Sequence, residues 1–376
     1  MSILTINAGS SSLKFAVYPL TNGVVQPSIF SGNIEGLEPG GSSTNSFAQA
    51  LTHLREQLAA RTDLPPLKVV AHRVVHGGSK YRRSVVVNDA ILNDLERFNP
   101  LAPLHQPHNL AGIRAFTEAF SELPQVACFD TAFHTSIPDV AAAFALPQAL
   151  SEQGIRRYGF HGLSYQYIIG SLQQHSLRAK GRVLMAHLGN GASLCAAVNG
   201  KSCATTMGFS AVDGLMMGTR CGTLDAGVML HLLEQGWSHD RLQALVYKQS
   251  GLLGVSGISA DMRRLRASAG TNPAAQNAID LFTHRVVRES GAMIASMGGL
   301  DVLAFSGGIG EHDAQLRHDV CQALAWLGVE IDAERNQNAL GNRPTHLHTP
   351  QSRIEVWLIP TDEGSVAARE AAELVA

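Results

Sequence analysis

The sequence carries almost no net charge. Its 29 Lys and Arg side chains stand against 31 Asp and Glu, which gives a formal net charge of -2 over 376 residues. A chain without an excess of either sign has no long-range attraction for nucleic acid or for an acidic membrane surface. We therefore expect small-molecule substrates, with no nucleic-acid partner and no membrane partner.

Paired cysteines and long apolar runs are missing as well. The five cysteines are an odd number without any Cys-x-x-Cys spacing, which argues against a disulfide framework and a structural zinc site. No stretch reaches the roughly 18 apolar residues of a membrane span. Residues 1–7 have no basic segment before an apolar core and no small-residue cleavage site. We expect a protein that stays in the reducing cytoplasm where it is made.

The chain does have ample apolar material and alternating secondary structure. Hydrophobic side chains make up 45% of it, and its length suggests roughly two or three domains, of which we expect two. Apolar runs predict strands at 68–75 and 125–129, and the wider apolar spacing predicts helices at 88–98 and 108–120. Strands and helices alternate from there, as in an α/β architecture.

Two polar turns lie in related surroundings. Apolar residues 3–6 and 13–18 flank the turn residues 7–12, which predicts a β-hairpin. Residues 6–17 align without gaps on residues 187–198. The identical pairs are Ser12/Ser193, Leu13/Leu194, Ala16/Ala197 and Val17/Val198. Two interpretations stay open: two unrelated hairpins, or a duplicated fold whose opposed turns would grip a polyphosphate through backbone N–H groups.

Two familiar nucleotide motifs are incomplete. Residues 200–202 resemble the end of a Walker A loop, but Cys195 stands where that loop needs a glycine. Residues 199 and 200 are better explained as a hairpin turn that requires positive φ. Residues 308–310 begin a dinucleotide fingerprint, yet its third glycine position is Asp313. Neither motif therefore supports a P-loop or a Rossmann domain.

The first turn ends in a lysine. The segment Asn7-Ala8-Gly9-Ser10-Ser11-Ser12-Leu13-Lys14 joins a strand end to hydroxyls, amides and a cation, which suits a phosphate tail with a metal ion beside it. A plain turn would explain the serines and the glycine. Lys14 favours an anion site, because a charge within an apolar strand must extend to solvent or meet an anion. Here the sequence resembles the acetate kinase family, whose opening signature is Asn-x-Gly-Ser-Ser-Ser-x-Lys.

Further segments resemble the same family in the same order along the chain. They are residues 72–78, 102–105, 129–134, 157–162, 187–191, 216–220, 261–263, 306–311 and 360–363. The resemblance extends from one end of the chain to the other, and such a set is far more specific than a single glycine-rich loop.

The resemblance implies an α/β fold of two duplicated actin-like (ribonuclease H-like) domains with a central nucleotide cleft. We expect residues 1–131 with 363–376 to form the first domain, and residues 132–362 to form the second, which would carry most nucleotide contacts. The resemblance also implies ATP or ADP as nucleotide, Mg²⁺ as metal with Mn²⁺ as a substitute, acetate or acetyl phosphate as the other substrate, and a homodimer.

The chemistry of the acceptor sets the catalytic requirements. A carboxylic acid with a pKa of about 4 is already ionised at pH 7, so it needs cations rather than a general base. Arg73 and Arg220 match the family's substrate and transition-state arginines, and His161 matches its transition-state histidine. Asp130 matches the residue described as the family's proton donor or acceptor. Because the nucleophile is already charged, we expect Asp130 to position a metal ion or an arginine.

The binding residues follow from the same resemblance. Asn7 and Glu363 match the magnesium-site residues. Val75, Leu104 and Phe160 match the wall of the pocket that takes the methyl group of the acid. The matches to nucleotide-contacting segments are Ser10, Ser12, Lys14, His187, Leu188, Gly189, Asn190, Gly191, Asp261, Met262, Arg263, Gly308, Ile309, Gly310, Glu311 and His312.

Some positions depart from the family pattern. They are residues 221–226 in place of Ser-Gly-Asp-x-Asp-Pro, His312 in place of Asn, Gly364 in place of a second Glu, and Ala211 in place of a pocket proline. None of them removes a charged catalytic group, but they bear on the size of the acid and on the contacts to the base. Two alternatives stay open: the same chemistry on propionate or another short-chain acid, and an ATP-driven switch of the actin or chaperone kind. The set Arg73, Asp130, His161 and Arg220 argues against the switch.

Overall fold

The computed structural model describes residues 1–9, 12–35, 47–103 and 105–376, and the chain forms two compact units. The first unit consists of Met1–Thr135, Gly162–Tyr167 and Asp362–Ala376. The second consists of Ser136–His161 and Ile168–Thr361. These units differ from the domains expected from the sequence at residues 132–135 and 362 and at Gly162–Tyr167, all of which group with the first unit.

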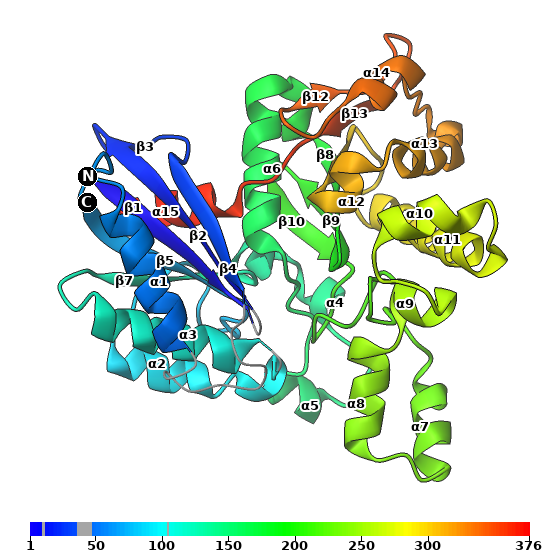
Figure 1. The fold of residues 1–376 in the computed structure, drawn as a ribbon. Coiled ribbons are helices and arrows are strands. Elements are labelled where there is room, and N and C mark those ends of the chain that lie inside the picture. Colours follow the sequence, from blue (N-terminus) through cyan, green and yellow to red (C-terminus); the bar gives the residue numbers. More distant parts are fainter. Residues whose placement is uncertain (10–11, 36–46, 104) are drawn as a thin grey trace. The chain divides into compact units, whose positions relative to one another are not determined.

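The first unit is built on a seven-stranded sheet within the described residues. Its strands are β1 (Ser2–Ala8), β2 (Ser12–Thr21), β3 (Val24–Val25), β4 (Phe30–Glu35), β5 (Leu67–Val74), β6 (Val85–Val86) and β7 (Gln125–Phe129). They follow the order β3-β2-β1-β5-β7-β6, with β4 paired to β2 (Figure 1). The predicted hairpin is confirmed, because β1 and β2 pair antiparallel, and so are the strands predicted at 68–75 and 125–129.

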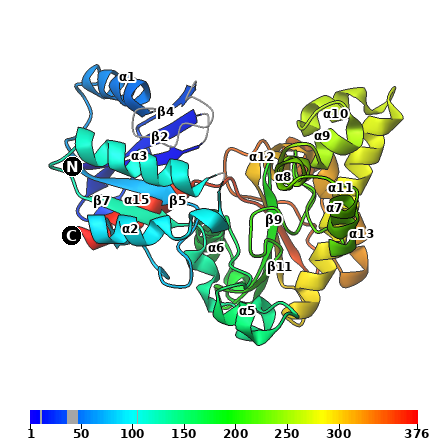
Figure 2. The same cartoon turned by 90° about the horizontal axis from the view of Figure 1, so that it is seen from below.

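Helices cover both faces of this sheet (Figure 2). They are α1 (Ala48–Ala59), α2 (Asp89–Glu96), α3 (Gln106–Ala119) and α15 (Glu363–Leu374), with 3-10 turns at Asn99–Leu101 and Ala132–Ser136. Successive strand side chains point to opposite faces. Leu4 of β1 therefore packs with Phe47 and Phe116 on the α1 and α3 side, whereas Ile3 packs with Ala368 of α15. Packing on both faces leaves β1 buried along almost its whole length, with only Asn7 partly exposed.

The second unit is built on a six-stranded sheet. Its strands are β8 (Arg182–Leu188), β9 (Ala192–Val198), β10 (Lys201–Thr205), β11 (Val302–Ser306), β12 (Thr345–His346) and β13 (Glu355–Leu358). They follow the order β10-β9-β8-β11-β13-β12. Asn199 and Gly200, between β9 and β10, have φ values of 53° and 76°, which confirms the predicted turn with positive φ.

Most of the remaining helices belong to the second unit. They are α4 (Asp139–Ala142), α5 (Gln148–Glu152), α6 (Gly162–His175), α7 (Ala226–Glu234), α8 (His239–Lys248), α9 (Gly251–Ser256), α10 (Met262–Ala269), α11 (Pro273–Ser296), α12 (Gly307–His312), α13 (Ala314–Ala323) and α14 (Ala333–Asn338), with 3-10 turns at Leu177–Lys180 and Ala325–Leu327. The start of α11 follows local chemistry: Asn272 caps it by accepting the N–H of Ala274, and proline fits its first position. No helix in the described ranges has both the length and the apolar character needed to cross a bilayer.

The strand orders show that the fold is duplicated. In each sheet an antiparallel hairpin, β1–β2 or β8–β9, is followed by two parallel neighbours, β5 and β7 or β11 and β13. The gapless alignment of the two hairpins is nevertheless wrong for one strand. Leu13 pairs with Ala8, but its counterpart Leu194 pairs with Ala186, where the alignment requires Gly189. The second hairpin extends further before it turns, and a short identity pattern cannot detect such a difference in turn length.

Candidate active site

In the first unit, polar side chains gather where three neighbouring strands end. Strands β1, β5 and β7 are parallel, so their carboxyl ends lie at one edge of the sheet. Asn7 lies near the end of β1, Arg73 near the end of β5, and Asp130 directly after β7. Glu363 is the first residue of α15. The strand order thus brings together four predicted site residues from distant parts of the sequence.

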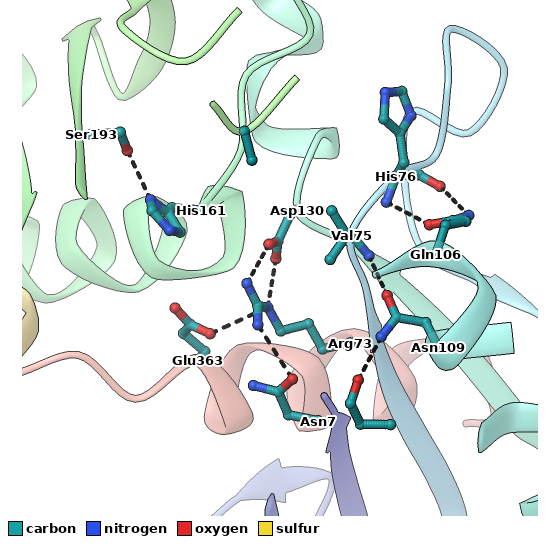
Figure 3. A network of polar contacts seen from close by, with 12 residues as sticks. Asn7, Arg73, Val75, His76, Gln106, Asn109, Asp130, His161, Ser193 and Glu363 are labelled. Carbon is teal, nitrogen blue, oxygen red and sulfur yellow. Dashed lines mark hydrogen bonds and ion pairs between the residues drawn. The ribbon is translucent and has the colours of Figure 1, made fainter. Parts of the chain in front are cut away.

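Arg73 lies at the centre of this cluster (Figure 3). Its Nε and Nη2 donate to the two carboxylate oxygens of Asp130 at 3.0 and 2.6 Å. Its Nη1 donates to Asn7 Oδ1 at 3.3 Å, and its Nε lies 3.5 Å from Glu363 Oε2. Burial lowers the pKa of Arg73, but the charges of Asp130 and Glu363 outweigh that effect and raise its pKa above the ordinary value. The guanidinium is therefore charged, and the bidentate pair fixes its plane.

The first turn of α15 is held by a tyrosine. The Tyr18 hydroxyl donates to Asp362 Oδ1 at 2.6 Å, and the same oxygen accepts the N–H of Ser365 at 3.1 Å as the cap of α15. Gly364 lies against this ring: a Cβ there would collide with the Tyr18 hydroxyl and come within 3.1 Å of Cζ. Tyr18 thus explains why a glycine follows Glu363, and the cap sets the direction in which Glu363 leaves the helix.

A small cavity lies beside these side chains. Its volume is about 180 Å³, and Asn7, Arg73 and Glu363 line it together with Lys14. Lys14 reaches it because β2 pairs Lys14 with Asn7 of β1, so both side chains stand on the same face of the hairpin. The cavity combines two cations with an amide and a carboxylate, a set able to bind an anion and a metal ion together.

Four further predicted residues belong to the first unit. Val75 is buried, with 7% of its surface exposed, and Ser12 is partly buried at the start of β2. Ser10 and Leu104 lie outside the described residues. The structure therefore places the phosphate-side and metal-side predictions together in this unit, whereas the turn residue Ser10 and the pocket residue Leu104 stay predictions from the sequence.

The oxygen atoms around Arg73 suit a hard divalent cation. Among the described residues, no group of three or more His, Cys, Asp and Glu side chains is arranged as a complete metal site. Mg²⁺ does not need one, because it keeps several of its waters and is held by one or two carboxylates plus phosphate oxygens. Asn7, Asp130 and Glu363 supply amide and carboxylate oxygens of this kind. The donor chemistry therefore fits Mg²⁺.

In the second unit, His161 has an unusual backbone for a residue with a side chain. Its φ is 59°, in the left-handed region, directly before α6. Its Nδ1 lies 2.8 Å from Ser193 Oγ, and its ring stacks on His187 with centroids 4.3 Å apart. A Cβ at Gly191 would come within 3.3 Å of His161 Nε2. The ring is thus held from two sides, and glycine keeps the space beside Nε2 open.

Arg220 lies in a loop that is bonded on two sides. Its Nη1 donates to the carbonyl of Ala211 at 2.9 Å, and the N–H of Gly218 donates to the carbonyl of Asn190 in the β8–β9 turn at 3.0 Å. The α8–α9 segment, which runs from Val246 near the end of α8 to Leu253 in α9, supplies the other side. Its backbone bonds are Cys221 N–H to Val246, Ser250 N–H to Thr219, Leu252 N–H to Met217 and Leu253 N–H to Gly218. The position of Arg220 is thus set by its loop.

A larger cavity, of about 860 Å³, also lies in the second unit. The predicted nucleotide residues that line it are Gly189, Asn190, Asp261, Met262, Arg263, Gly308, Ile309 and His312. The lining residues that the sequence did not suggest are Ala260, Arg266, Asp313, Ala314, Gln315 and Gln337. Its volume lies in the range of ligand pockets, which is about 300–1,000 Å³. Segments 189–190, 260–263 and 308–315 therefore converge on one ligand-sized cavity.

Other predicted nucleotide residues of this unit do not line that cavity. They are His187, Leu188, Gly191, Gly310 and Glu311. The Glu311 carboxylate accepts the N–H of Gly307 at 2.9 Å and the N–H of Thr361 at 3.2 Å, so it ties the start of α12 to the segment before α15. Gly310 presents its carbonyl to Arg317 Nη1 at 2.9 Å. Both residues thus support segments next to the cavity without lining it themselves.

Three buried side chains that hold these segments were not predicted from the sequence. Ser193 contacts His161, Asn109 of α3 bridges two strand ends, and Arg317 of α13 holds the end of α12. For Ser193 a signal existed, because the two hairpins share a serine at this position. For Asn109 and Arg317 there was none, since a polar residue within a helix is usually exposed to solvent.

Comparison with known proteins places these features in one family. A family model described as the Acetokinase family matches residues 2–369. The acetate kinase of Rhodopseudomonas palustris is 47% identical, over 98% of this chain and 96% of that protein. The acetate kinase of Methylocella silvestris is 43% identical, over 99% of this chain and 98% of that protein.

Solved structures agree with the sequence comparison. A propionate kinase from Francisella tularensis has a TM-score of 0.89 and 35% identity, covering 98% of both chains. The acetate kinase of Porphyromonas gingivalis has a TM-score of 0.86 and 32% identity, covering 100% of both chains. The similarity in fold and in sequence therefore extends over both units.

Proposed function

The chain belongs to the acetokinase family, and on that premise we propose that it is an acetate kinase, which reversibly transfers the γ-phosphoryl group of ATP to acetate and forms acetyl phosphate and ADP. Its two units have the duplicated actin-like fold predicted from the sequence. The observation that carries the proposal is the cavity of the first unit, where the cations Arg73 and Lys14 stand beside the oxygens of Asn7 and Glu363.

The first unit supplies the groups for the acid. Acetate is ionised at neutral pH, so it attacks the phosphorus without losing a proton. Arg73 binds its carboxylate and offsets the repulsion between two anions. Asp130 is 1% exposed and accepts hydrogen bonds from Nε and Nη2 of that arginine, which suits a positioning role rather than proton transfer.

The second unit supplies groups for the transferring phosphoryl group. Arg220 and His161 would stabilise the negative charge on its equatorial oxygens in the transition state. The hydrogen bond between Nδ1 and Ser193 Oγ orients the His161 ring, and Gly191, which has no Cβ, leaves room beside Nε2 for the phosphoryl group. Neither side chain needs to donate or accept a proton for the reaction to balance.

The nucleotide and the metal complete the proposal. The cavity of about 860 Å³ in the second unit would hold ADP or ATP. Asn7 and Glu363 would hold Mg²⁺, or Mn²⁺ in its place, largely through water. When bound, the ion neutralises phosphate charge and orients the transferring group.

The identity of the acid rests on finer features. Acetate is our first choice, because the relatives named above at 43% and 47% identity are acetate kinases. Propionate is the second candidate, since a propionate kinase is among the similar structures and Ala211 replaces a pocket proline. A switch of the actin or chaperone kind would lack a carboxylate acceptor, and the match to the acetokinase family over residues 2–369 argues against it.

We also propose a homodimer in the cytoplasm. Helix α7 contains mostly apolar residues, yet none of them is buried within the chain. Leu230 is 62% exposed and Leu233 is 49% exposed, which is unusual for neighbouring leucines unless another surface covers them. A second copy of the chain would do so. Sedimentation velocity tests this: the wild type should be a dimer, and Leu230→Glu should shift it toward monomer.

One assay tests the proposed reaction directly. The enzyme is incubated with ATP, Mg²⁺ and one acid at a time, and hydroxylamine traps any acyl phosphate as a hydroxamate. Acetate should give the most product and propionate less. ATP hydrolysis without hydroxamate from any acid would contradict the carboxylate kinase assignment and favour an ATP-driven switch.

A further inference from the structure

Strands β1 and β5 separate before they end. Their parallel pairing runs to Ile6 and His72, whereas β1 continues to Ala8 and β5 to Val74. The separation begins at Asn7 and Arg73, the two residues whose side chains meet between the strands at 3.3 Å. Beyond the last pair, the distance between the strand ends is no longer set by the sheet itself.

A buried carboxamide joins the two strands at this point (Figure 3). Asn109 of α3 is 5% exposed. Its Nδ2 donates to the carbonyl of Ala8 at 2.7 Å, and its Oδ1 accepts the N–H of Val75 at 3.0 Å. One side chain thus uses a donor and an acceptor to join the end of β1 to the end of β5, as a peptide group would do in a continuous ladder.

We propose that Asn109 is a positioning residue: it sets the spacing between the strand ends that carry Asn7 and Arg73, and thereby aligns the metal-side and acid-side groups of the reaction. The inference rests on the proposed function. Ala8 is covalently next to Asn7, and Val75 is two residues beyond Arg73, so a shift of either bonded backbone group moves one of these side chains relative to the other.

The neighbouring Gln106 provides an internal contrast. It lies one turn before Asn109 on α3 and is fully buried. Its Oε1 accepts the N–H of His76 at 3.1 Å, and its Nε2 donates to the carbonyl of the same residue at 2.9 Å. Both bonds of Gln106 go to one residue after β5, so Gln106 holds that segment without reaching β1. Of these two carboxamides, that of Asn109 is the one that joins the two strands.

The test compares Asn109→Asp with Gln106→Glu. Each change replaces a buried carboxamide by a carboxylate of the same shape and removes one donor, so the two variants carry similar losses of hydrogen bonding. Mn²⁺ binding in the presence of ADP, followed by electron paramagnetic resonance, serves as a readout that does not depend on turnover. Asn109→Asp should weaken Mn²⁺ binding and lower kcat by about 10-fold or more, the range known for residues that orient metal ligands. Gln106→Glu should leave Mn²⁺ binding close to wild type.

Equal Mn²⁺ affinity in Asn109→Asp and the wild type would overturn the proposal, and so would an equal loss of Mn²⁺ affinity in both variants. Circular dichroism checks that each variant is folded. Should Asn109→Asp fail to fold, Asn109→Ser, which adds no charge, is compared in the same way. Wild-type enzyme that forms no hydroxamate would refute the proposed reaction, whereas the Mn²⁺ comparison would still decide the role of Asn109.

Discussion

The two units share one strand order but hold the segment after β5 and the segment after β11 with different chemistry. In the first unit, the neutral carboxamides of Gln106 and Asn109 hold it from α3. In the second, Arg317 of α13 donates to the carbonyls of Gly310 and Glu311 at 2.9 and 2.8 Å. In sequence, α3 lies between β5 and β7, and α13 lies between β11 and β13, the corresponding strands of the second sheet.

The difference follows from the charge that each site must have. Arg317 is fully buried, and although burial lowers its pKa to about 10, it remains charged at pH 7. A cation behind the cavity that we assign to the nucleotide favours phosphate oxygens. In the first unit, the cations Arg73 and Lys14 already stand beside the carboxylates of Asp130 and Glu363, so a neutral carboxamide positions the backbone without adding a charge. In both units a helix side chain thus positions the backbone after a strand, and the charge of that side chain suits the site beside it.

The largest expected effect concerns the two arginines, one in each unit. Arg73→Ala and Arg220→Ala should each lower turnover by on the order of 10³-fold, the scale of a charge-neutralising arginine in phosphoryl transfer. Lysine should rescue poorly at both positions, because it keeps the charge but loses the planar fork. Steady-state kinetics on purified variants checks this. Retention of more than a tenth of wild-type turnover would remove the residue concerned from the mechanism.

The variants Arg73→Ala and Arg220→Ala should also differ in their free energy of unfolding. Arg73→Ala leaves the buried carboxylate of Asp130 without its bidentate partner, which should lower the free energy of unfolding by roughly 1–3 kcal/mol. The contacts described for Arg220 go to the neutral carbonyl of Ala211 and to the sulfur of Met217, and hydrogen bonds to neutral acceptors contribute less than those to a buried carboxylate. Urea titrations should therefore show a clear loss for Arg73→Ala and a smaller one for Arg220→Ala. Similar losses would mean that the two arginines are held alike.

A smaller effect is expected at His161. His161→Ala should lower kcat by about 10²-fold with little change in ATP affinity, because its contact would form mainly with the transferring phosphoryl group. Ser193→Ala should lower kcat less, since it removes only the group that orients the ring. Isothermal titration with a non-hydrolysable nucleotide checks the affinity. An effect confined to KM would contradict a transition-state role for His161.

Two glycines with almost the same φ angle test how the loop of Arg220 is held. Gly251 has φ 65° and Gly257 has φ 64°, so alanine at either position carries a similar strain of roughly 1–2 kcal/mol. A Cβ at Gly251 would collide with the carbonyl of Met217 and come within 2.9 Å of the carbonyl of Arg220, whereas nothing lies within 4 Å at Gly257. Gly251→Ala should therefore lower kcat by roughly 10-fold or more through displacement of Arg220. Gly257→Ala should stay near wild type, and equal activities would show that the α8–α9 segment does not position Arg220.

The sequence predicts the parts of this molecule that depend on local patterns. The hairpins, the strand at 68–75 and the turn at 199–200 follow from apolar spacing and turn residues, and all are present. Motif resemblance also places Asn7, Arg73, Asp130 and Glu363 near one another, and the structure does so too.

What the sequence does not predict depends on contacts between distant segments. Asn109 and Arg317 are polar residues within helices, so the sequence predicts that they are exposed. They are buried because the fold packs strand ends and loops against them. From the sequence, Gly364 is only a position where the family pattern has a second Glu. In the structure, Tyr18, which is distant in sequence, occupies the space that a Cβ at residue 364 would need. The register of the second hairpin cannot be read from four identities, because the register depends on the length of the turn, which the matched residues do not show.

The smallest expected effect concerns the size of the acid and again distinguishes the units. Ala211 stands where the family pattern has a pocket proline, and its carbonyl accepts the hydrogen bond of Arg220 at 2.9 Å, which proline can preserve. Replacing proline by alanine removes ring carbons, and room for one methylene is worth roughly 0.8 kcal/mol, a few-fold in specificity. Ala211→Pro should therefore lower kcat/KM for propionate by a few-fold more than for acetate. Equal losses on both acids would show that residue 211 does not sense the length of the acid and would leave selectivity to the other predicted pocket residues, Val75, Leu104 and Phe160.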